Sequence, residues 1–225
     1  MSDVITVELD ESRDPVRSAL DESGAATRSD FFKKALVGGG ALAVGGLTIG
    51  GLPSLALGKP SAKQDVAILN FALLLEYLEA NFYVQAVRSG NLNGKLAAFA
   101  TTVRNHELAH VKALKTALGS AAIAEPAFDF KDSFSTEATF IATSILLEDT
   151  GVAAYDGQGP RLRRKTLPAA AAIVSVEARH AAWIRFLAGE FGQDAKGGPA
   201  PEVLNPALTK GQVTAAVTAT GFIKS

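Results

Sequence analysis

Apolar residues recur every three or four positions through four long segments that follow Pro60, and this spacing predicts amphipathic helices. The expected helices run from about Lys63 to Arg88, from Lys95 to Leu118, from Glu137 to Tyr155, and from Pro168 to Phe191. Glycine, asparagine or proline stands at the breaks after the first three, and Ser135 or Thr136 can cap the third. The fold class is therefore expected to be all-α, with a four-helix bundle over residues 61–191. A C-terminal tail at residues 192–225 contains a weaker helical pattern near 212–222, and we assign it no chemistry.

The connections between the expected helices differ in length, and this difference selects a topology. The turn between the first two helices is short, so these helices should lie antiparallel to each other. The second helix is roughly 36 Å long, and the segment after it can reach roughly 50 Å when it is extended. That segment can cross the whole bundle, so we expect one long crossover between the second and third helices.

Each expected helix carries one glutamate near the middle of an otherwise apolar face: Glu76, Glu107, Glu148 and Glu177. On the second and fourth helices a histidine follows three residues later, at His110 and His180. A buried carboxylate without a partner is very costly, and four at one level would also repel one another. Two divalent cations would balance four carboxylates, and residues i and i+3 of a helix can both reach one ion. The pattern therefore predicts a site for two metal ions.

The two halves of the chain repeat this layout. Glu76 is followed seven residues later by Tyr83, and Glu148 is followed seven residues later by Tyr155. The two glutamates of the first half lie 31 residues apart (107 − 76), and those of the second half lie 29 apart (177 − 148). Of the three histidines in the chain, two follow a glutamate by three positions. Two helical hairpins of the same layout predict a site with pseudo-twofold symmetry.

Two further polar residues lie next to these positions. Glu79 is one turn after Glu76 and could be an outer group around the metal site, a surface residue or a substitute ligand. His106 adjoins Glu107 but lies about 100° away from it around the helix, so we expect a surface or packing role.

The tyrosines and one basic run also have alternative interpretations. Tyr83 and Tyr155 could be core residues that make one hydrogen bond each, or they could act in the site. The basic run at residues 161–165 contains Arg161, Arg163, Arg164 and Lys165, and it predicts a solvated loop.

Residues 1–58 differ in composition from the rest of the chain. Residues 1–34 are polar and acidic before they end in basic residues, and we expect them to be disordered. The uncharged apolar segment at 35–58 ends in small residues, which is the layout of a secretory signal. The frame at 27–34 resembles a twin-arginine export signal, except that Ser29 stands where the second arginine would be. An uncleaved membrane anchor is the alternative, because the segment is long enough to span a bilayer.

Composition and charge exclude several classes of protein. The formal net charge is −1, which gives no electrostatic footprint for nucleic acid. The chain has no cysteine, so disulfides, thiolate zinc sites, iron–sulfur clusters and cysteine nucleophiles are excluded. A metal ion would have to be held by carboxylate and imidazole groups, a ligand set that suits iron, manganese or zinc.

Two stretches, LEYLEANFY at residues 75–83 and HELAH at 106–110, resemble the ferritin-like superfamily of bacterioferritins, rubrerythrins and manganese catalases. The first is similar in particular to exported ferritin-like proteins related to plant desiccation-associated proteins. The resemblance covers about residues 61–191, and all six ligand positions of the superfamily are filled. It implies bridging roles for Glu107 and Glu177 and terminal carboxylates at Glu76 and Glu148. It also implies imidazole ligands at His110 and His180, with the tyrosines as outer hydrogen-bond donors or radical traps.

The resemblance also implies a function. We expect two metal ions, iron or alternatively manganese, and redox activity toward O₂ or peroxide as a ferroxidase, peroxidase or catalase-like scavenger in stress protection. Two alternatives stay open: a non-catalytic stress or envelope protein whose metal only stabilises the bundle, and a subunit of an iron-storage cage. The chain should be exported to the periplasm or cell envelope, and anchored in a membrane only if residues 35–58 are not cleaved. Its partners would be metal ions and O₂ or peroxide rather than nucleic acid, with homo-oligomers left open.

Overall fold

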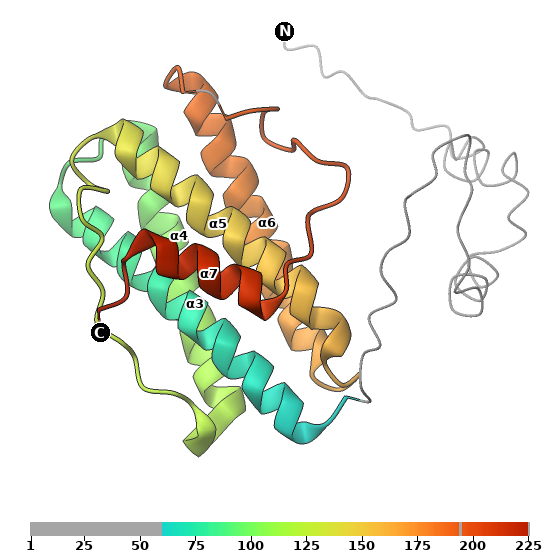
Figure 1. The fold of residues 1–225 in the computed structure, drawn as a ribbon. Helices are drawn as coiled ribbons and strands as arrows, with labels where there is room; N and C mark the ends of the chain where they lie inside the picture. The colour runs from blue at the N-terminus through green and yellow to red at the C-terminus, as the bar shows by residue number, and fades with distance from the viewer. Residues whose placement is uncertain (1–59, 194, 225) are drawn as a thin grey trace, which may run out of the picture. The chain divides into compact units, whose positions relative to one another are not determined.

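The structure, a computed structural model, describes residues 60–193 and 195–224, and this part of the chain is helical without a regular strand. Four long helices form a bundle: α3 (Ala62–Ser89), α4 (Gly94–Leu118), α5 (Glu137–Gln158) and α6 (Leu167–Glu190) (Figure 1). The other helical elements are η1 (Gly119–Ala121), η2 (Gly159–Arg161) and α7 (Lys210–Thr220). The all-α bundle expected from the hydrophobic pattern is therefore confirmed. The expected disordered and signal-type segments lie outside the described residues.

Local sequence signals set the helix ends. The Ser61 hydroxyl accepts a hydrogen bond from the backbone N–H of Gln64 at the start of α3, and Thr136 forms a reciprocal capping box with Thr139 at the start of α5. Helix α3 ends at Gly90, whose φ of 69° lies in the left-handed region that glycine adopts without steric cost. Helix α5 ends at Gln158 rather than at Tyr155, because a glycine inside a helix lowers its stability without ending it.

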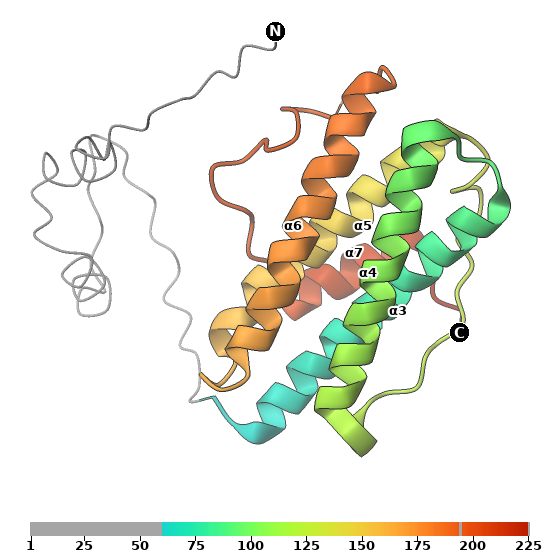
Figure 2. The ribbon, with the colours of Figure 1, turned by 180° about the vertical axis from the view of Figure 1, so that it is seen from behind.

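The bundle consists of two helical hairpins. Helix α3 packs mainly against α4, and α5 packs mainly against α6. The hairpins meet where α3 contacts α5 and, on the opposite side of the molecule, where α4 contacts α6 (Figure 2). The segment between α4 and α5 runs the length of the bundle, so these two helices point in the same direction (Figure 1). The long crossover expected from the connection lengths is therefore present.

Helix α3 is central to the core. The rings of Phe82, Phe130, Phe134 and Phe140 form an aromatic cluster in which Phe82 lies 5.1–5.6 Å from the other three, centroid to centroid. Among the described residues, α3 is also the one helix whose length and composition would suit a membrane span. That stretch is 72% buried within the bundle, as in the core helix of a globular domain.

Asparagine side chains of α3 hold the crossover against the bundle. Asn70 donates a hydrogen bond to the carbonyl of Ala121 at 2.8 Å and accepts one from the backbone N–H of Ile123 at 2.9 Å. Three turns later, Asn81 donates to the carboxylate of Glu125 at 2.6 Å. The Asn70 bonds satisfy two backbone groups of the crossover, and the Asn81 bond holds one of its side chains.

The C-terminal segment contributes to the core. Val213 and Val217 of α7 are buried, and α7 packs on α5. After α7, the backbone of Phe222 accepts a hydrogen bond from Asp129 N–H at 2.8 Å, and Phe128 forms an antiparallel bridge with Ile223. The tail therefore closes over the crossover.

Two basic residues depart from the expected solvated loop: Nε of Arg161 is buried without a hydrogen bond, and Arg163 pairs with an acid of α3. Arg164 and Lys165 are exposed, but Arg163 donates to the carboxylate of Asp65 from its backbone N–H at 3.1 Å and from Nε at 2.8 Å. The Thr166 hydroxyl donates to the same carboxylate. Burial pushes the pKa of Asp65 up, but these hydrogen bonds together lower it below its usual value. The contact fixes the α5–α6 connection to the first turn of α3.

Asn70 offers a direct test of how the crossover is held. We expect Asn70→Ala to lower the free energy of unfolding by about 1–3 kcal/mol, because two backbone groups lose their partner. Chemical denaturation of the metal-free protein would measure this. The control is Asn105→Ala at an exposed position of α4, which should change stability by less than about 0.5 kcal/mol. Equal effects of the two substitutions would contradict the role assigned to Asn70.

Candidate metal centre

The six side chains expected as metal ligands meet inside the bundle, and each of the four helices contributes at least one. They are Glu76 from α3, Glu107 and His110 from α4, Glu148 from α5, and Glu177 and His180 from α6. All four glutamates are 0% exposed, and His110 and His180 are 9% and 2% exposed. Burial this complete shows that the glutamates do not extend along the bundle edge into solvent.

The six residues form two overlapping groups that could each hold a metal ion. One group is Glu76, Glu107, His110 and Glu177, and the other is Glu107, Glu148, Glu177 and His180. Within each group, one potential ligand atom per residue lies within 4.8 Å of all the others. Glu107 and Glu177 belong to both groups, which is the arrangement that two bridging carboxylates would produce.

The contacts of the imidazoles show how the two groups are related. Nδ1 of His110 lies 3.2 Å from an oxygen of Glu76, 3.2 Å from Oε2 of Glu107 and 2.8 Å from Oε1 of Glu177. Nδ1 of His180 lies 3.0 Å from Oε1 of Glu107 and 3.3 Å from Oε2 of Glu177. Each shared glutamate therefore directs one oxygen toward each histidine. The pseudo-twofold symmetry of the sequence repeats is present in the side-chain geometry.

The two tyrosines connect the hairpins in a crossed pattern. Tyr155 of α5 donates a hydrogen bond to Oε1 of Glu76 on α3 at 2.5 Å. Tyr83 of α3 donates to Oε1 of Glu148 on α5, and its oxygen lies 2.6 Å from the hydroxyl of Ser144. Each tyrosine thus contacts the carboxylate of the opposite hairpin. Both are buried, so the hydroxyl of each contacts a carboxylate of the site rather than solvent.

Several buried polar atoms of the centre have no hydrogen bond. They are Oε1 of Glu107, Oε2 of Glu148, both carboxylate oxygens of Glu177, and Nδ1 of His180. The four oxygens lie 2.8–3.4 Å from Nδ1 of His110 or His180, among the other atoms of the two ligand groups. Unpaired buried carboxylate oxygens are strongly disfavoured, and a divalent cation between them would satisfy them. The donor set of oxygen and imidazole nitrogen fits iron or manganese.

The electrostatics reflect this crowding. Burial, followed by the neighbouring Glu177 and Glu107, holds the pKa of Glu76 well above its usual value. Burial likewise raises the pKa of Glu148 to about 8. Burial also raises the pKa of Glu107, but its contacts with the two imidazoles outweigh burial and lower the pKa to about 2.

The histidines respond in the opposite sense. Burial opposes their protonation, but three carboxylate contacts each raise the pKa of His110 and of His180 to about 12. Without metal, the centre is therefore balanced by protons on the imidazoles and on some of the carboxyl groups.

Glu79 is a fifth buried acid near the centre. It is 2% exposed, so the surface alternative is wrong, and neither ligand group includes it. Burial and the nearby charges of Glu177 and Glu148 raise its pKa well above the usual value. Its carboxylate lies against Gly151 of α5, where an added Cβ would approach Oε1 to 2.9 Å. The glycine therefore leaves the room that this outer carboxyl group occupies.

His106 is exposed, as expected, but its ring does not point away from the centre. Nδ1 of His106 lies 2.8 Å from Nε2 of His180, and the two rings are nearly parallel, with an interplanar angle of 17°. The expectation considered only the helix that carries His106. It could not include α6, which places His180 beside it. In the sequence, the only sign that His106 lies near the centre is its position next to Glu107.

The described residues contain two spaces beside Tyr155. An open hollow of about 290 Å³ between α5 and α6 is lined by Tyr155, Gly159 and Ala170 among others. A small apolar cavity of about 10 Å³ on the α3 side has the same three residues in its wall. The ring of Tyr155 thus lies between the surface hollow and Glu76.

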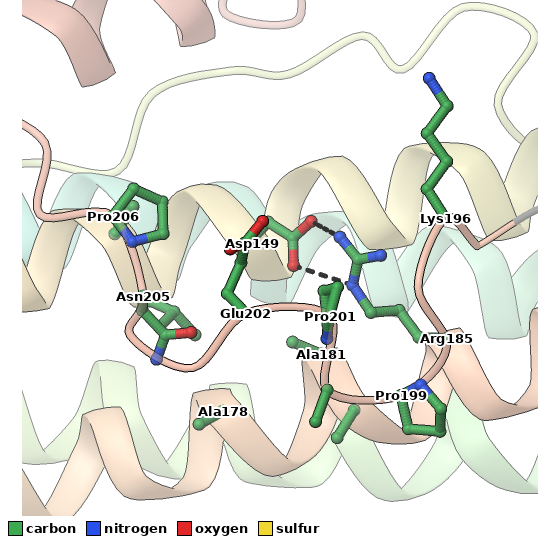
Figure 3. Close-up of a pocket in the computed structure, with 14 residues that line it drawn as sticks. Asp149, Ala178, Ala181, Arg185, Lys196, Pro199, Pro201, Glu202, Asn205 and Pro206 are labelled. Atoms are coloured by element: carbon green, nitrogen blue, oxygen red, sulfur yellow. Dashed lines mark hydrogen bonds and ion pairs between the residues drawn. The ribbon is translucent and has the colours of Figure 1, made fainter. Parts of the chain in front are cut away.

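A larger hollow, of about 510 Å³, lies on the outer side of α5 and α6 under the α6–α7 loop (Figure 3). The Arg185 guanidinium in its wall donates to the carboxylate of Asp149 and to the carbonyl of Ala195, at 2.7 Å for the latter. It contains none of the six ligand residues. The hollow is therefore separate from the metal centre.

Comparison with known protein families agrees with this geometry. The profile described as ferritin-like domain matches residues 64–190, which include all four bundle helices almost completely and all six candidate ligands. Among curated proteins, none matches the chain. Because the match extends over more than half of the sequence, the chain belongs to the ferritin-like domain family.

Proposed function

We propose that this chain is a di-metal carboxylate protein that binds two iron or manganese ions and reacts with O₂ or peroxide. One observation carries the proposal: six side chains from four helices form two buried ligand groups that share two glutamates. The unpaired oxygens of Glu148 and Glu177 in these groups support it further.

The residues have distinct roles in this proposal. Glu107 and Glu177, which belong to both ligand groups, would contact both ions. Glu76 with His110 would complete the first group, and Glu148 with His180 would complete the second. Bound iron or manganese would supply the redox chemistry toward the oxidant.

Tyr155 has a further role at the proposed entrance. Tyr155 lines the surface hollow, and its hydroxyl, which donates to Glu76, can hold a proton beside that carboxylate. Tyr83 makes the equivalent hydrogen bond on the other side, but its ring packs within the core against Phe82, Phe99 and Phe140. We infer that small oxidants approach from the Tyr155 side.

Metal content and turnover test the proposal together. We expect the isolated protein to contain close to two iron or manganese ions per chain, and to consume O₂ or peroxide faster than the free ions do. Glu107→Ala should abolish the rise in melting temperature that metal produces, because both ions lose a ligand. The isosteric Glu107→Gln keeps the packing and should reduce the rise in melting temperature that metal produces. The control, Glu202→Ala on an exposed loop, should leave that rise unchanged.

Each negative outcome has a separate meaning. Absence of bound metal, with melting unchanged on its addition, would refute the di-metal assignment. Two bound ions without turnover would leave a protein that metal only stabilises. Turnover with mineral uptake in a large assembly would instead identify a storage cage, and size-exclusion chromatography would detect that assembly.

The raised pKa values predict how stability depends on pH. The Glu148 carboxyl, raised from 4.5 to about 8, binds more protons in the folded than in the unfolded state over that interval. The two histidines, raised from 6.5 to about 12, do the same above pH 6.5. The stability of the metal-free protein should therefore fall as pH rises from about 5 to 9. The contribution of Glu107, lowered to about 2, is constant in this range.

Metal replaces these protons, so the metal-induced increase in melting temperature should grow with pH over the same range. Thermal unfolding with chelator or with Mn²⁺ at several pH values would measure both trends. Glu148→Gln, which cannot ionise, should flatten the slope of the metal-free protein between about pH 5 and 8. A metal effect independent of pH would argue against the protonated centre.

The two tyrosines form a matched pair for testing the entrance. Tyr83→Phe and Tyr155→Phe each remove a buried hydrogen bond to a carboxyl group, and should cost similar stability of about 1–3 kcal/mol. Both variants should keep two ions. We expect only Tyr155→Phe to slow the reaction with peroxide or O₂ strongly, on the order of 100-fold. Equal rate losses in single-turnover measurements would show that the hollow at Tyr155 is not the route.

A further inference from the structure

The contact between His106 and His180 joins an exposed residue to the buried centre. His106 lies on α4, and its Nδ1 is 2.8 Å from Nε2 of His180 on α6. The opposite nitrogen of His180, Nδ1, lies 3.0–3.4 Å from oxygens of Glu107, Glu148 and Glu177. The two nitrogens of one imidazole therefore have different partners: carboxylates on one side and a second imidazole on the other.

This geometry determines which nitrogen of His180 carries a proton. A metal ion among the three carboxylates would need the lone pair of Nδ1, so the proton of a neutral His180 would be on Nε2. That N–H would donate to Nδ1 of His106, which must then be an acceptor with its own proton on Nε2. Since His106 is exposed, that second N–H can be hydrated.

His110 has no equivalent support among the described residues. Its Nδ1 faces Glu76, Glu107 and Glu177 much as Nδ1 of His180 faces its own group. Its hydrogen bonds in the structure are confined to that nitrogen. With 11% of its side chain exposed, its outer edge reaches solvent instead. The two halves of the centre are thus alike in ligands but unlike in what orients their imidazoles.

We propose that His106 is a positioning residue that holds His180 with Nδ1 directed at the metal position, and so makes the two metal positions unequal. The ion in the group of Glu148 and His180 gains affinity from this contact, and the ion in the group of Glu76 and His110 does not. The inference rests on the proposed di-metal function. Outer hydrogen bonds to metal-binding histidines typically change affinity by about 10–100-fold when they are removed.

Two substitutions of similar size distinguish the effect of losing the hydrogen bond from the effect of changed packing. His106→Asn keeps a side-chain acceptor near the position of Nδ1, and His106→Leu removes it. Asn105→Leu, at the adjacent exposed position, serves as the control. The full-length protein would be titrated anaerobically with Mn²⁺, and free and bound Mn²⁺ would be counted by electron paramagnetic resonance.

For His106→Leu we expect one of the two Mn²⁺ affinities to fall about 10–100-fold while the other is unchanged. His106→Asn should restore much of the lost affinity, and the control should bind as the parent protein does. The inference is overturned if His106→Leu leaves both affinities unchanged, if it weakens both equally, or if His106→Asn is no better than His106→Leu. Failure of the parent protein itself to bind two ions would overturn the proposed function as well, so the two failures are distinguishable.

Discussion

The structure depends on the cost of keeping carboxylates away from water at one level of a helical bundle. In the described part of the chain, four glutamates with no exposed surface, and Glu79 beside them, share an interior in which two imidazoles are the buried basic groups. Without metal, protons offset part of this negative charge, as the raised pKa values of Glu76, Glu79 and Glu148 show. Two divalent ions would replace those protons with a stronger and more directional partner. The buried carboxylates thus lower the stability of the metal-free protein, and bound metal would raise it.

The rest of the fold serves to bring these groups to the same depth. Each hairpin supplies one terminal glutamate and one Glu-x-x-His pair, and the crossover fixes the direction of the second hairpin relative to the first. The tyrosines then connect the hairpins, because each one donates to the terminal carboxylate of the other. Contacts far from the centre, such as Asp65 with Arg163, set the spacing of the helix ends. Small losses in these contacts would be felt at the metal ligands.

Periodicity predicted the helices and the six convergent side chains, and the connection lengths predicted the crossover. Helical spacing, segment length and the cost of buried charge can all be read from the sequence alone. The features that were missed depend on which helices become neighbours. The contact of His106 requires α6 to lie beside α4, and the burial of Glu79 requires Gly151 on α5 to leave room for it. Arg163 is held by an acid 98 residues away in sequence. No pattern within one helix contains such information.

The two ligand groups are alike, but their surroundings differ, and this difference would let two bound ions have different functions. The side of Glu76 and Tyr155 adjoins a surface hollow, so a small oxidant would reach this ion first. The side of Glu148 and His180 is closed by Tyr83 and its aromatic neighbours, and His106 holds its imidazole from outside. An ion that reacts with an oxidant must be accessible to it and needs exchangeable protons nearby. The other ion must be bound tightly by its ligands. The two halves of the bundle thus carry the same candidate ligands but differ in their outer contacts, so two bound ions would have different surroundings.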